Sequence, residues 1–510
     1  MRTSRPFLHC PSRRDFFSFS LVLFAFWLGT LYSQSPSQLL PARGSSSSAL
    51  HGGPPSTSLQ SSLPAAPFSA SARLPAVQQV VASSFACEDG PLPAGSAAPA
   101  TPDARSPDGG GPSCVFEGLY LREGRLYFAV EVGAGEAEEA ALQAAAARLP
   151  TGYHLGHDMN VAAHEHLVAP VPVALSTVRA WAGGSAPPPF SPYPLLLFSR
   201  LNPKNIYHHL WDDQMFAHAT LCRHLPGLAA RGLSPGGGGP QGACAPGTVP
   251  PFALALVDSF GERDLADWAA TVAVEVHAWP LASPGGSPGG LSRIALAVAG
   301  TRGLCTHRRH CSNIMPAAPV RLFRAHLQAL HGVVTALPPP GAPQTAVLVR
   351  RTGRRVLTNL AELEQLVARM GFTPRVVGPL KDMTVQQQYE AFANASLAVF
   401  VFGAELGPAW VGLPEGSCSA VLHPAGIMDT LSHWVADKVG LKVSSVVENF
   451  KSSGDPRLAP RPEWGGRESG GLAFEQYSDV WLWLFNHDFR MDPKDLWRMV
   501  WCTNAPWPPD

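Results

Sequence analysis

From residue 345 onward the chain alternates short apolar runs with segments of helical period, and this alternation constrains the fold more than any other feature. The apolar runs have the length of buried strands and lie at residues 345–349, 375–377 and 397–402. The segments between them begin with the spacing of capping boxes, Asn359 with Glu362 and Thr384 with Gln387. A strand–helix–strand–helix–strand order is typical of a parallel, doubly wound sheet. Residues 344–480 are therefore predicted to form one Rossmann-like domain.

A second α/β domain is predicted for residues 113–335. Its short β-rich runs lie between turn signals, at residues 114–121, 125–132, 194–199, 252–257, 272–276 and 294–298. Residues 319–331 carry apolar side chains on one helical stripe, and the Pro-rich residues 336–343 form a stiff linker to the next domain. In the C-terminal segment, residues 481–510, a helix is predicted to begin at Asp492. The predicted fold class is therefore α/β with two Rossmann-like domains.

The first 112 residues are predicted to carry a membrane anchor and a stem. Basic residues precede an uncharged apolar run at residues 16–32, which is near the lower length limit of a spanning helix. Because arginines favour the cytosolic side, residues 1–15 are predicted to be a cytosolic tail. A cleaved signal peptide is the alternative, although no convincing cleavage site follows Tyr32. Residues 33–112, rich in Ser, Pro, Ala and Gly, are predicted to form a disordered stem because they cannot bury enough apolar surface to fold.

Charge and cysteine usage narrow the classes of partner and cofactor. The formal net charge is zero, so the chain lacks the basic excess that marks a nucleic-acid partner. With the anchor retained, Cys10 is cytosolic and the other eight of the nine cysteines are luminal, an even number that an oxidising compartment allows. Their connectivity does not follow from the sequence. The cysteines and histidines of residues 305–311 match no common zinc-finger spacing, and no metal site is predicted.

Two histidine–aspartate pairs follow the apolar run at residues 194–199, where an open α/β sheet binds ligands if that run is a buried strand. If the following segment is helical, His208 and Asp212 stand at i and i+4 on one face. His209 and Asp213 have the same spacing. An imidazole that a carboxylate orients is a candidate proton acceptor. The alternative is a capped helix with a solvated charge pair.

Two further segments have the chemistry to hold a diphosphate. Arg351 and Arg355 leave the carboxyl end of a predicted strand, and arginine forks bind phosphate oxygens in pairs. Gly403 and Ala404 leave another strand, where a following helix points backbone N–H groups at an anion and glycine permits close approach. Taken singly, a solvated basic turn and an ordinary strand-end glycine are the alternatives.

The residues of these segments resemble, in the same order, the motifs of the family-61 glycosyltransferases. The first match is Arg200-x-Asn202-Pro-x-Asn205-x-x-His208-x-x-x-Asp212-Asp213. The second comprises Arg351-Thr-x-x-Arg355, Asn394-Ala-Ser396, Gly403-Ala404-Glu405-Leu406 and Leu413-Pro-Glu-Gly416. Together with a Cys-x-Phe opening at Cys114, the matches cover residues 114–424. They most resemble members that add N-acetylglucosamine to protein O-linked mannose, with a relation to those that act on EGF domains.

The resemblance implies two Rossmann-like domains that face a cleft, the GT-B arrangement, with the acceptor on residues 113–335 and the donor on residues 344–480. The resemblance supplies the positions of the site and the chemistry above suggests the roles. These are catalysis by His208, Asp212 and Asp213, donor binding by Arg351, Arg355, Gly403, Ala404 and Glu405, and support of the cleft loop by Arg200, Asn202 and Asn205. The resemblance also implies a disulfide between Cys87 and Cys114.

Two positions depart from the family pattern. Phe402 stands where the family has the His before Gly-Ala, and Val421 stands where it has a Glu in the strand after Leu-Pro-x-Gly. An imidazole near the diphosphate and a carboxylate for ribose hydroxyls are therefore missing. Glu405 and His423 are the candidates to replace them.

The sequence supports two hypotheses from different classes. In the first, the protein is an inverting, metal-independent transferase and a type II protein of the endoplasmic reticulum or Golgi membrane. It moves N-acetylglucosamine from a UDP-sugar, with xylose as the second choice, to a luminal protein or protein-linked glycan. No Asp-x-Asp triplet is present to build the usual metal–diphosphate clamp, so no metal or other cofactor is expected. In the second, suggested by Phe402 and Val421, the protein is a catalytically silent relative that binds glycans or scaffolds other transferases.

Overall fold

The computed structural model describes a folded part of the chain in several stretches. These are residues 79–88, 113–150, 155, 168–200, 205–230, 244–258, 260, 265–282, 290–300, 315–423, 431–447 and 488–503. The predicted tail, the predicted anchor and most of the predicted stem lie outside them. Within these stretches, no helix combines the length and the apolar composition that crossing a membrane requires.

The first region of the chain forms a mixed eight-stranded sheet in the order β4-β3-β2-β8-β5-β6-β7, with β1 paired to β2. The strands are β1 (Ser84–Glu88), β2 (Ser113–Arg122), β3 (Arg125–Val130), β4 (Val171–Ala174), β5 (Leu195–Phe198), β6 (Ala253–Leu256), β7 (Glu275–Ala278) and β8 (Ser292–Ala299). Strands β8, β5, β6 and β7 pair in parallel, whereas β2 runs antiparallel to β1, β3 and β8. The prediction of an α/β fold is thus confirmed for this region.

Both faces of the parallel part are buried, as the apolar strand β5 requires. Its Leu196 and Phe198 belong to one core cluster, and Leu195 and Leu197 to another on the opposite face. The helices of this region are α2 (Glu138–Arg148), α4 (Leu175–Trp181), α5 (Ile206–His208), α6 (Met215–Ala230), α7 (Leu265–Thr271) and α9 (Ala317–Leu330). The four residues of β5 are completely or almost completely buried, so this strand gives the segment that begins at Ser199 a fixed starting point.

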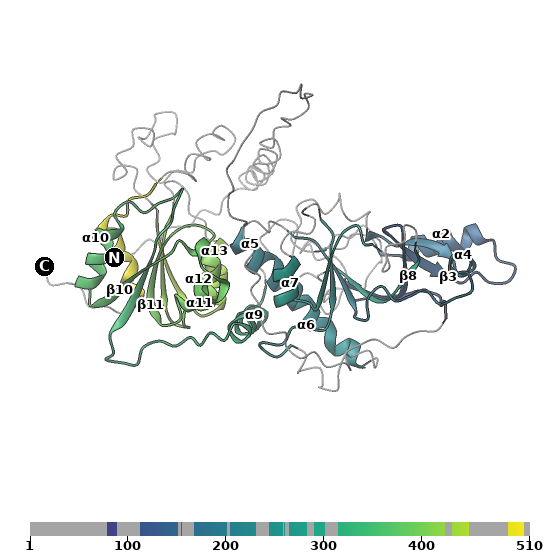
Figure 1. The fold of residues 1–510 in the computed structure, drawn as a ribbon, viewed down its shortest axis with the longest axis horizontal. Helices are drawn as coiled ribbons and strands as arrows, with labels where there is room; N and C mark the ends of the chain where they lie inside the picture. Colours follow the sequence, from purple (N-terminus) through teal and green to yellow (C-terminus); the bar gives the residue numbers. More distant parts are fainter. Residues whose placement is uncertain are drawn as a thin grey trace, which may run out of the picture. The chain divides into compact units, whose positions relative to one another are not determined.

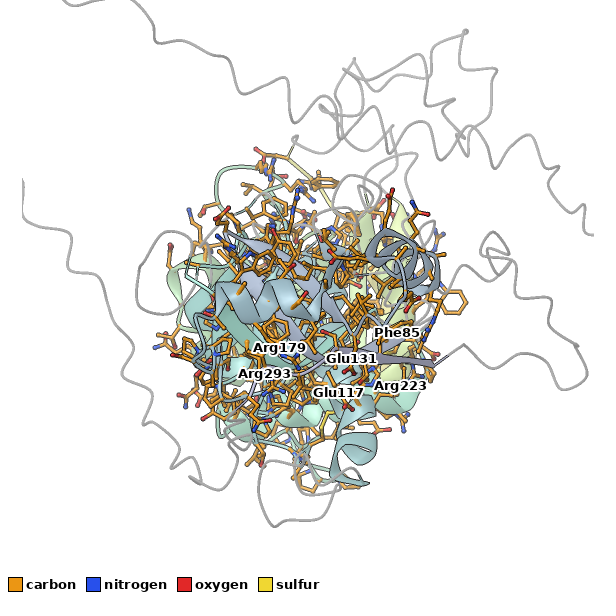
Figure 2. All side chains as sticks on the ribbon, turned by 90° about the vertical axis from the view of Figure 1, so that its right-hand side faces the viewer. Phe85, Glu117, Glu131, Arg179, Arg223 and Arg293 are labelled. Atoms are coloured by element: carbon orange, nitrogen blue, oxygen red, sulfur yellow. A yellow bond between two sulfur atoms is a disulfide. The ribbon has the colours of Figure 1, made fainter. Side chains whose placement is uncertain are left out.

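Strand β1 lies inside the range that the sequence predicted as stem, and that boundary is wrong. The strand pairs with β2, and the disulfide between Cys87 and Cys114 joins the two, as the resemblance implied. Phe85, labelled in Figure 2, packs against Phe116 and Phe128 with ring centroids 5.8 Å away in each case. Composition missed this strand because a five-residue segment held by partners far along the chain needs little apolar content of its own.

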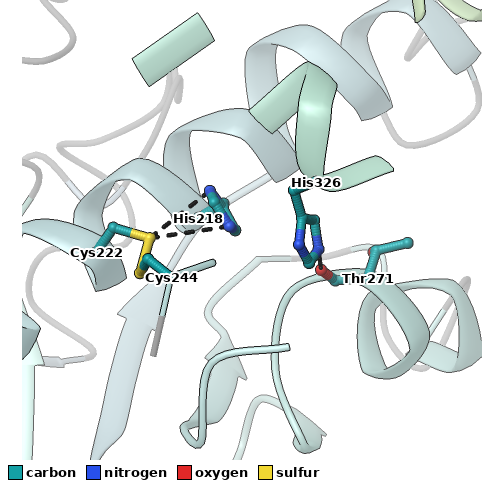
Figure 3. Close-up of a disulfide and its surroundings, with 5 residues drawn as sticks. All are labelled: His218, Cys222, Cys244, Thr271 and His326. Atoms are coloured by element: carbon teal, nitrogen blue, oxygen red, sulfur yellow. Dashed lines mark hydrogen bonds between the residues drawn. A yellow bond between two sulfur atoms is a disulfide. The ribbon is translucent and has the colours of Figure 1, made fainter. Parts of the chain in front are cut away.

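A second disulfide, between Cys222 and Cys244, fastens α6 to the segment that precedes β6. Figure 3 shows this disulfide beside the buried ring of His218, whose nitrogens lie 3.8 Å from Cys222 Sγ. The ring of His326 lies 4.7 Å from that of His218, and its Nε2 donates to the carbonyl of Thr271 at 2.7 Å. The sequence did not predict this connectivity.

The second region forms a five-stranded parallel sheet in the order β10-β9-β11-β12-β13. Its strands are β9 (Gln344–Val349), β10 (Phe372–Val377), β11 (Ala395–Val401), β12 (Cys418–His423) and β13 (Lys442–Val447). Its helices are α10 (Leu360–Arg369), α11 (Val385–Glu390), α12 (Leu406–Gly412), α13 (Leu431–Lys438) and α16 (Pro493–Met499). Figure 1 shows α10 on one face of this sheet and α11, α12 and α13 on the other. Residues 344–447 thus match the predicted alternation of strands and helices.

One of the two predicted capping boxes is present and the other is not. Thr384 accepts from the backbone N–H of Gln387, and the Gln387 side chain accepts from the backbone of Thr384, as predicted. Asn359 instead donates to the backbone carbonyl of Met491 at 2.8 Å and does not cap α10. Asn359 therefore ties the C-terminal segment to this sheet, where α16 packs in the same core cluster as α10.

Helix α9 precedes the linker at residues 336–343, yet it packs against the second region. Its Val320, Phe323 and Leu327 share a core cluster with side chains of α12 and α13. Buried Arg324 donates to the carbonyls of Val411, Leu413 and Val439, which lie at the C-terminal ends of α12 and α13. A guanidinium at two helix C-termini satisfies carbonyls that have no partner within their own helices. The predicted domain boundary in the linker therefore does not separate two independent cores.

Candidate functional site

The segment after β5 leaves the first sheet at a topological switch point. In chain order the parallel strands β5, β6, β7 and β8 are arranged 4-1-2-3, so the chain proceeds from β5 to one side and returns to its other side. Ligands of open α/β sheets bind outside the carboxyl ends of the two strands at which the order reverses, here β5 and β8. Arg200 lies at this edge, as the sequence predicted.

Arg200 is nevertheless not available to a ligand. Its Nε and Nη2 donate to the two carboxylate oxygens of Asp258 at 2.8 and 2.7 Å, and its backbone N donates to the same carboxylate at 3.1 Å. The side chains of this pair are 0% and 2% exposed. Asp258 follows β6, the strand beside β5, so the pair fastens two adjacent strand ends. Arg200 thus joins the ends of β5 and β6, while Asn202 lies outside the described residues.

The helix that follows is continuous from Ile206 but contains one π-helical segment. It begins as α5, with Asn205 as N-cap accepting from the backbone N of Tyr207 at 3.1 Å, and continues as η2 (His209–Gln214) into α6. A π segment has a wider turn than an α-helix and recurs at functional sites. Asn205 therefore begins this helix as its N-cap.

His208 and Asp212 form the predicted pair. His208 Nδ1 lies 2.6 Å from Asp212 Oδ2, and the side chains are 22% and 0% exposed. Because the carboxylate accepts, Nδ1 carries the proton and the lone pair of the neutral ring is at Nε2. The buried carboxylate therefore fixes both the orientation and the tautomer of a partly exposed imidazole.

His209 does not form the second predicted pair. Its Nε2 lies 2.9 Å from Gln214 Nε2, five residues along, which is the spacing that a π segment brings onto one face. The ring is 4% exposed and packs edge-on to Trp268. Burial, and then the positive charge of Arg200, lower the pKa of His209 from 6.5 to about 4. Asp213 is fully buried as well, and of the two histidines only His208 is partly exposed.

The second sheet also has a switch point, and both predicted donor segments lie there. Numbered from β9, its order is 2-1-3-4-5, so the reversal falls between β9 and β11. Arg351 and Arg355 follow β9, and Gly403 follows β11. Arg355 Nη1 donates to the carbonyl of Phe402 at 2.9 Å, and Arg351 Nη1 approaches the same carbonyl at 3.4 Å. The structure therefore brings the two sequence-distant segments together.

Glu405 joins Arg351 and Arg355, and these three residues are called the arginine cluster below. Its Oε2 lies 2.8 Å from Arg351 Nη1, with the two side chains 22% and 10% exposed. Burial lowers the pKa of Arg351, and Glu405 acts against that shift. Burial and then the charges of the neighbouring arginines lower the pKa of Arg355 to about 10. Arg355 also has a φ of +57°, a left-handed conformation that a non-glycine residue rarely adopts.

Gly403 permits a close approach, but the group that approaches is Arg351. A Cβ built on Gly403 would overlap Arg351 Nη1 and lie 3.0 Å from Glu405 Oε2. Gly403 and Ala404 form the turn into α12, where their carbonyls accept from the backbone N of Leu406 and Gly407. The expected open glycine surface is therefore covered by the guanidinium in this structure.

Gly407 joins the two halves of the predicted site. A Cβ at this position would lie 2.9 Å from Tyr207 Cα, so only glycine lets α12 meet α5 at this distance. Trp211 Nε1 donates to the Gly407 carbonyl at 3.0 Å, and the Tyr207 ring packs edge-on to Trp410. The residue next to Tyr207 is His208, and Gly407 follows Glu405 by two residues. This contact therefore joins the helix that carries His208 to the segment that carries Glu405.

The two departures from the family pattern have distinct surroundings. Phe402 stacks on the ring of His423 with centroids 5.0 Å apart, and His423 Nε2 lies 3.2 Å from Ser445 Oγ. Burial, and then His433, lower the pKa of His423 to about 3, so this fully buried ring is neutral and supplies no positive charge to a diphosphate. Val421 belongs to the apolar cluster, where an ionised carboxylate would be costly.

Sequence reasoning missed Asp258, Tyr207, Gly407 and Trp410. Asp258 follows the apolar run at residues 252–257, so its position at a strand end next to Arg200 was a usable signal. Gly407 carried none, because its role depends on a contact with residues two hundred positions earlier. Among the residues described here, no group of three or more His, Cys, Asp or Glu side chains is arranged to hold a metal. The histidines and cysteines of residues 305–311 lie outside that part.

No family model matches this chain, and no curated protein matches it either.

Proposed function

We propose that the protein is an inverting, metal-independent glycosyltransferase that uses a UDP-sugar, with N-acetylglucosamine as the sugar and xylose as the second choice. The acceptor is a luminal protein or protein-linked glycan. The enzyme is a single-pass type II protein of the endoplasmic reticulum or Golgi membrane. Its two α/β regions act as Rossmann-like domains of the GT-B kind, with the donor held by the second.

One observation carries the proposal: the contact between Tyr207 and Gly407 joins the segment with a carboxylate-oriented imidazole to the segment with the arginine cluster, which lies at a switch point. Inverting transfer needs these two groups on opposite sides of one anomeric carbon. A base must take the proton of the acceptor hydroxyl as the new bond forms, and positive charge must stabilise the diphosphate that leaves.

In this mechanism His208 Nε2 accepts the hydroxyl proton while Asp212 stabilises the imidazolium that results. The acceptor oxygen attacks the anomeric carbon, and the bond from that carbon to the diphosphate breaks, with inversion. Arg351 and Arg355 stabilise the charge on the departing UDP through paired hydrogen bonds. Arg200, already neutralised by Asp258, holds the loop that precedes the base.

The alternative function is that of a silent relative that binds glycans or scaffolds other transferases. Its support is that Arg351 covers Gly403 and pairs with Glu405, and that Phe402 replaces an imidazole. The two functions differ in one measurement. Radiolabelled transfer from a panel of nucleotide sugars, with the full chain purified in detergent, is expected for the transferase and absent for the silent relative.

Variants then test the assigned roles. His208→Ala and Asp212→Asn should lower turnover, by about 10²–10⁴-fold for loss of the base, at nearly unchanged UDP binding. His277→Ala is the matched control, because His277 is also a partly exposed histidine near a carboxylate, that of Glu275, and both of these residues lie on β7. Retained turnover with lost UDP affinity in His208→Ala would make His208 a donor contact instead.

UDP binding is tested separately. At about 100 times its dissociation constant, a ligand that binds only the folded state stabilises it by about 2.7 kcal/mol. UDP should raise the melting temperature of the wild type and raise it less in Arg351→Ala. Equal shifts in the two proteins would remove Arg351 from the site.

The proposed topology has its own test. Digestion of sealed microsomes should leave the folded part protected, since it is proposed to be luminal. Digestion of that part by external protease would contradict the proposed orientation.

A further inference from the structure

In the arginine cluster, the carboxylate of Glu405 already pairs with Arg351, where a diphosphate would bind. Glu405 Oε2 lies 2.8 Å from Arg351 Nη1, and the pair holds the guanidinium over the backbone of Gly403. Arg351 is 10% exposed, so this arrangement is packed into the protein rather than spread over its surface. A diphosphate that binds between Arg351 and Gly403 must therefore displace a carboxylate that makes the same kind of contact.

We propose that Glu405 is a built-in competitor for the donor, which holds Arg351 against Gly403 until a diphosphate takes the place of its carboxylate. This inference rests on the proposed function, because it concerns the same donor site. It adds a residue that sets the affinity and selectivity for the donor, a role different from that of a direct ligand.

Charge balance gives the competition a direction. Arg351 and Arg355 both bond to the carbonyl of Phe402, and Glu405 brings one negative charge to them. A nucleoside diphosphate brings at least two negative charges and several acceptor oxygens, so it can satisfy both guanidiniums at once. An uncharged sugar or a single carboxylate cannot. The pair therefore favours diphosphate ligands over weaker anions.

Burial explains why such a competitor is useful when the site is empty. Removing guanidinium groups from water without a partner is costly, and burial lowers the pKa of both arginines while Glu405 acts against the shift. Glu405 thus stabilises the charged site in the absence of donor. The same interaction is lost when the donor enters, so it lowers the net affinity.

Glu405→Gln tests the inference, because it keeps the shape of the side chain and removes its charge. Calorimetry on the full chain measures the dissociation constants of UDP and of inorganic pyrophosphate. We expect both ligands to bind about tenfold more tightly in Glu405→Gln than in the wild type. Glu390→Gln is the matched control, since Glu390 is an exposed residue of α11, and it should leave both constants unchanged.

The outcomes separate the inference from the proposed function. If the wild type binds UDP and transfers sugar but Glu405→Gln binds equally or more weakly, Glu405 is not a competitor and the transferase assignment stands. Weaker binding would identify Glu405 as a direct donor contact. If neither protein binds UDP or pyrophosphate, the donor site itself is disproved, and the inference with it. Pyrophosphate without UDP binding would leave an anion site that does not recognise the nucleoside.

Discussion

Arg200 and Arg351 leave the carboxyl ends of comparable strands, yet they have different partners and different uses. Each lies at the switch point of a parallel sheet, Arg200 after β5 and Arg351 after β9. Arg200 is sealed by two hydrogen bonds from its guanidinium to Asp258, and both side chains are almost fully buried. Among the described carboxylates, Arg351 contacts that of Glu405, which is 22% exposed.

The difference teaches that position at a strand end does not reveal whether an arginine serves the fold or a ligand. The deciding feature is the partner. A buried carboxylate at the neighbouring strand end, such as that of Asp258, accepts two hydrogen bonds from the guanidinium and keeps it from a ligand. A partly exposed glutamate in the turn that follows the next strand, as in Glu405, is proposed to be exchanged for another anion. The first region therefore uses its arginine to join two strand ends, whereas the proposed function assigns the arginine of the second region to ligand binding.

The sharpest test of this comparison breaks the sealed pair. Asp258→Asn keeps the shape of the side chain but removes the Asp258 carboxylate from the buried Arg200 charge, and breaking a buried pair in this way costs about 3–5 kcal/mol of stability. Chemical denaturation followed by circular dichroism should show a large loss. Glu405→Gln is the matched control, because it removes the carboxylate of the more exposed pair and should cost far less.

If Asp258→Asn does not fold well enough to measure, the double variant Arg200→Met with Asp258→Leu keeps the comparison testable. Replacing both charges by apolar side chains of similar size is often neutral or stabilising. Recovery of folded protein in the double variant would assign the loss to the uncompensated charge. Equal stability of Asp258→Asn and the wild type would contradict the view that Arg200 serves the fold.

The second prediction concerns pH and His209, a buried histidine whose pKa is lowered by burial and by the charge of Arg200. His209 has a pKa of about 4 in the folded protein and 6.5 when unfolded, so the unfolded chain binds more protons between these values. Stability contributed by neutral His209 is therefore fully present above pH 6.5 and is lost as the pH falls toward 4. For this one group, the loss between pH 7 and pH 5 is about 2 kcal/mol.

Denaturation curves of the wild type and of His209→Gln at several pH values check this effect. The glutamine can still accept from Gln214, so the variant should fold and its stability should fall less steeply with acid. A residual slope is expected from other buried histidines, among them His218, whose pKa burial lowers to about 3. Identical slopes in the two proteins would show that His209 is not buried in its neutral form.

Much of the fold could be predicted because local periodicity survives in the tertiary structure. The strands and helices from β9 to α12 follow apolar spacing and turn residues, and the pair His208–Asp212 follows from helical geometry alone. Strand β1 could not be predicted in the same way, since its partners are the distant strand β2 and a disulfide. Strand propensity depends only on the residues of a segment, whereas β1 forms because it pairs with β2 and is joined to it by the disulfide.

The unpredicted parts of the site have a common physical origin. The π segment moves the partner of His209 from Asp213 to Gln214, because one inserted residue changes which side chains share a face. The role of Gly407 could not be predicted, because it depends on the close approach of the Tyr207 backbone, which the sequence does not reveal. Sequence reasoning chose residues at the strand ends of the two sheets but could not tell which of them pair with one another.

The smallest effect is expected for Arg351→Ala without ligand, and it is also the most direct contrast with Arg200. Loss of Arg351 breaks a pair whose glutamate can turn toward water, and Phe402 keeps its hydrogen bond from Arg355 at 2.9 Å. Such a partly exposed pair contributes about 1 kcal/mol or less. The melting temperature of Arg351→Ala without UDP should therefore lie close to that of the wild type, whereas Arg200→Ala should melt at a far lower temperature because it removes the partner of the buried Asp258 carboxylate.

If Arg351→Ala is destabilised as strongly as Arg200→Ala, Arg351 serves the fold in the way Arg200 does, and the distinction between a buried, paired arginine and an exchangeable one fails. If Arg351→Ala is nearly as stable as the wild type and loses only the stabilisation by UDP, the residue is retained for its ligand.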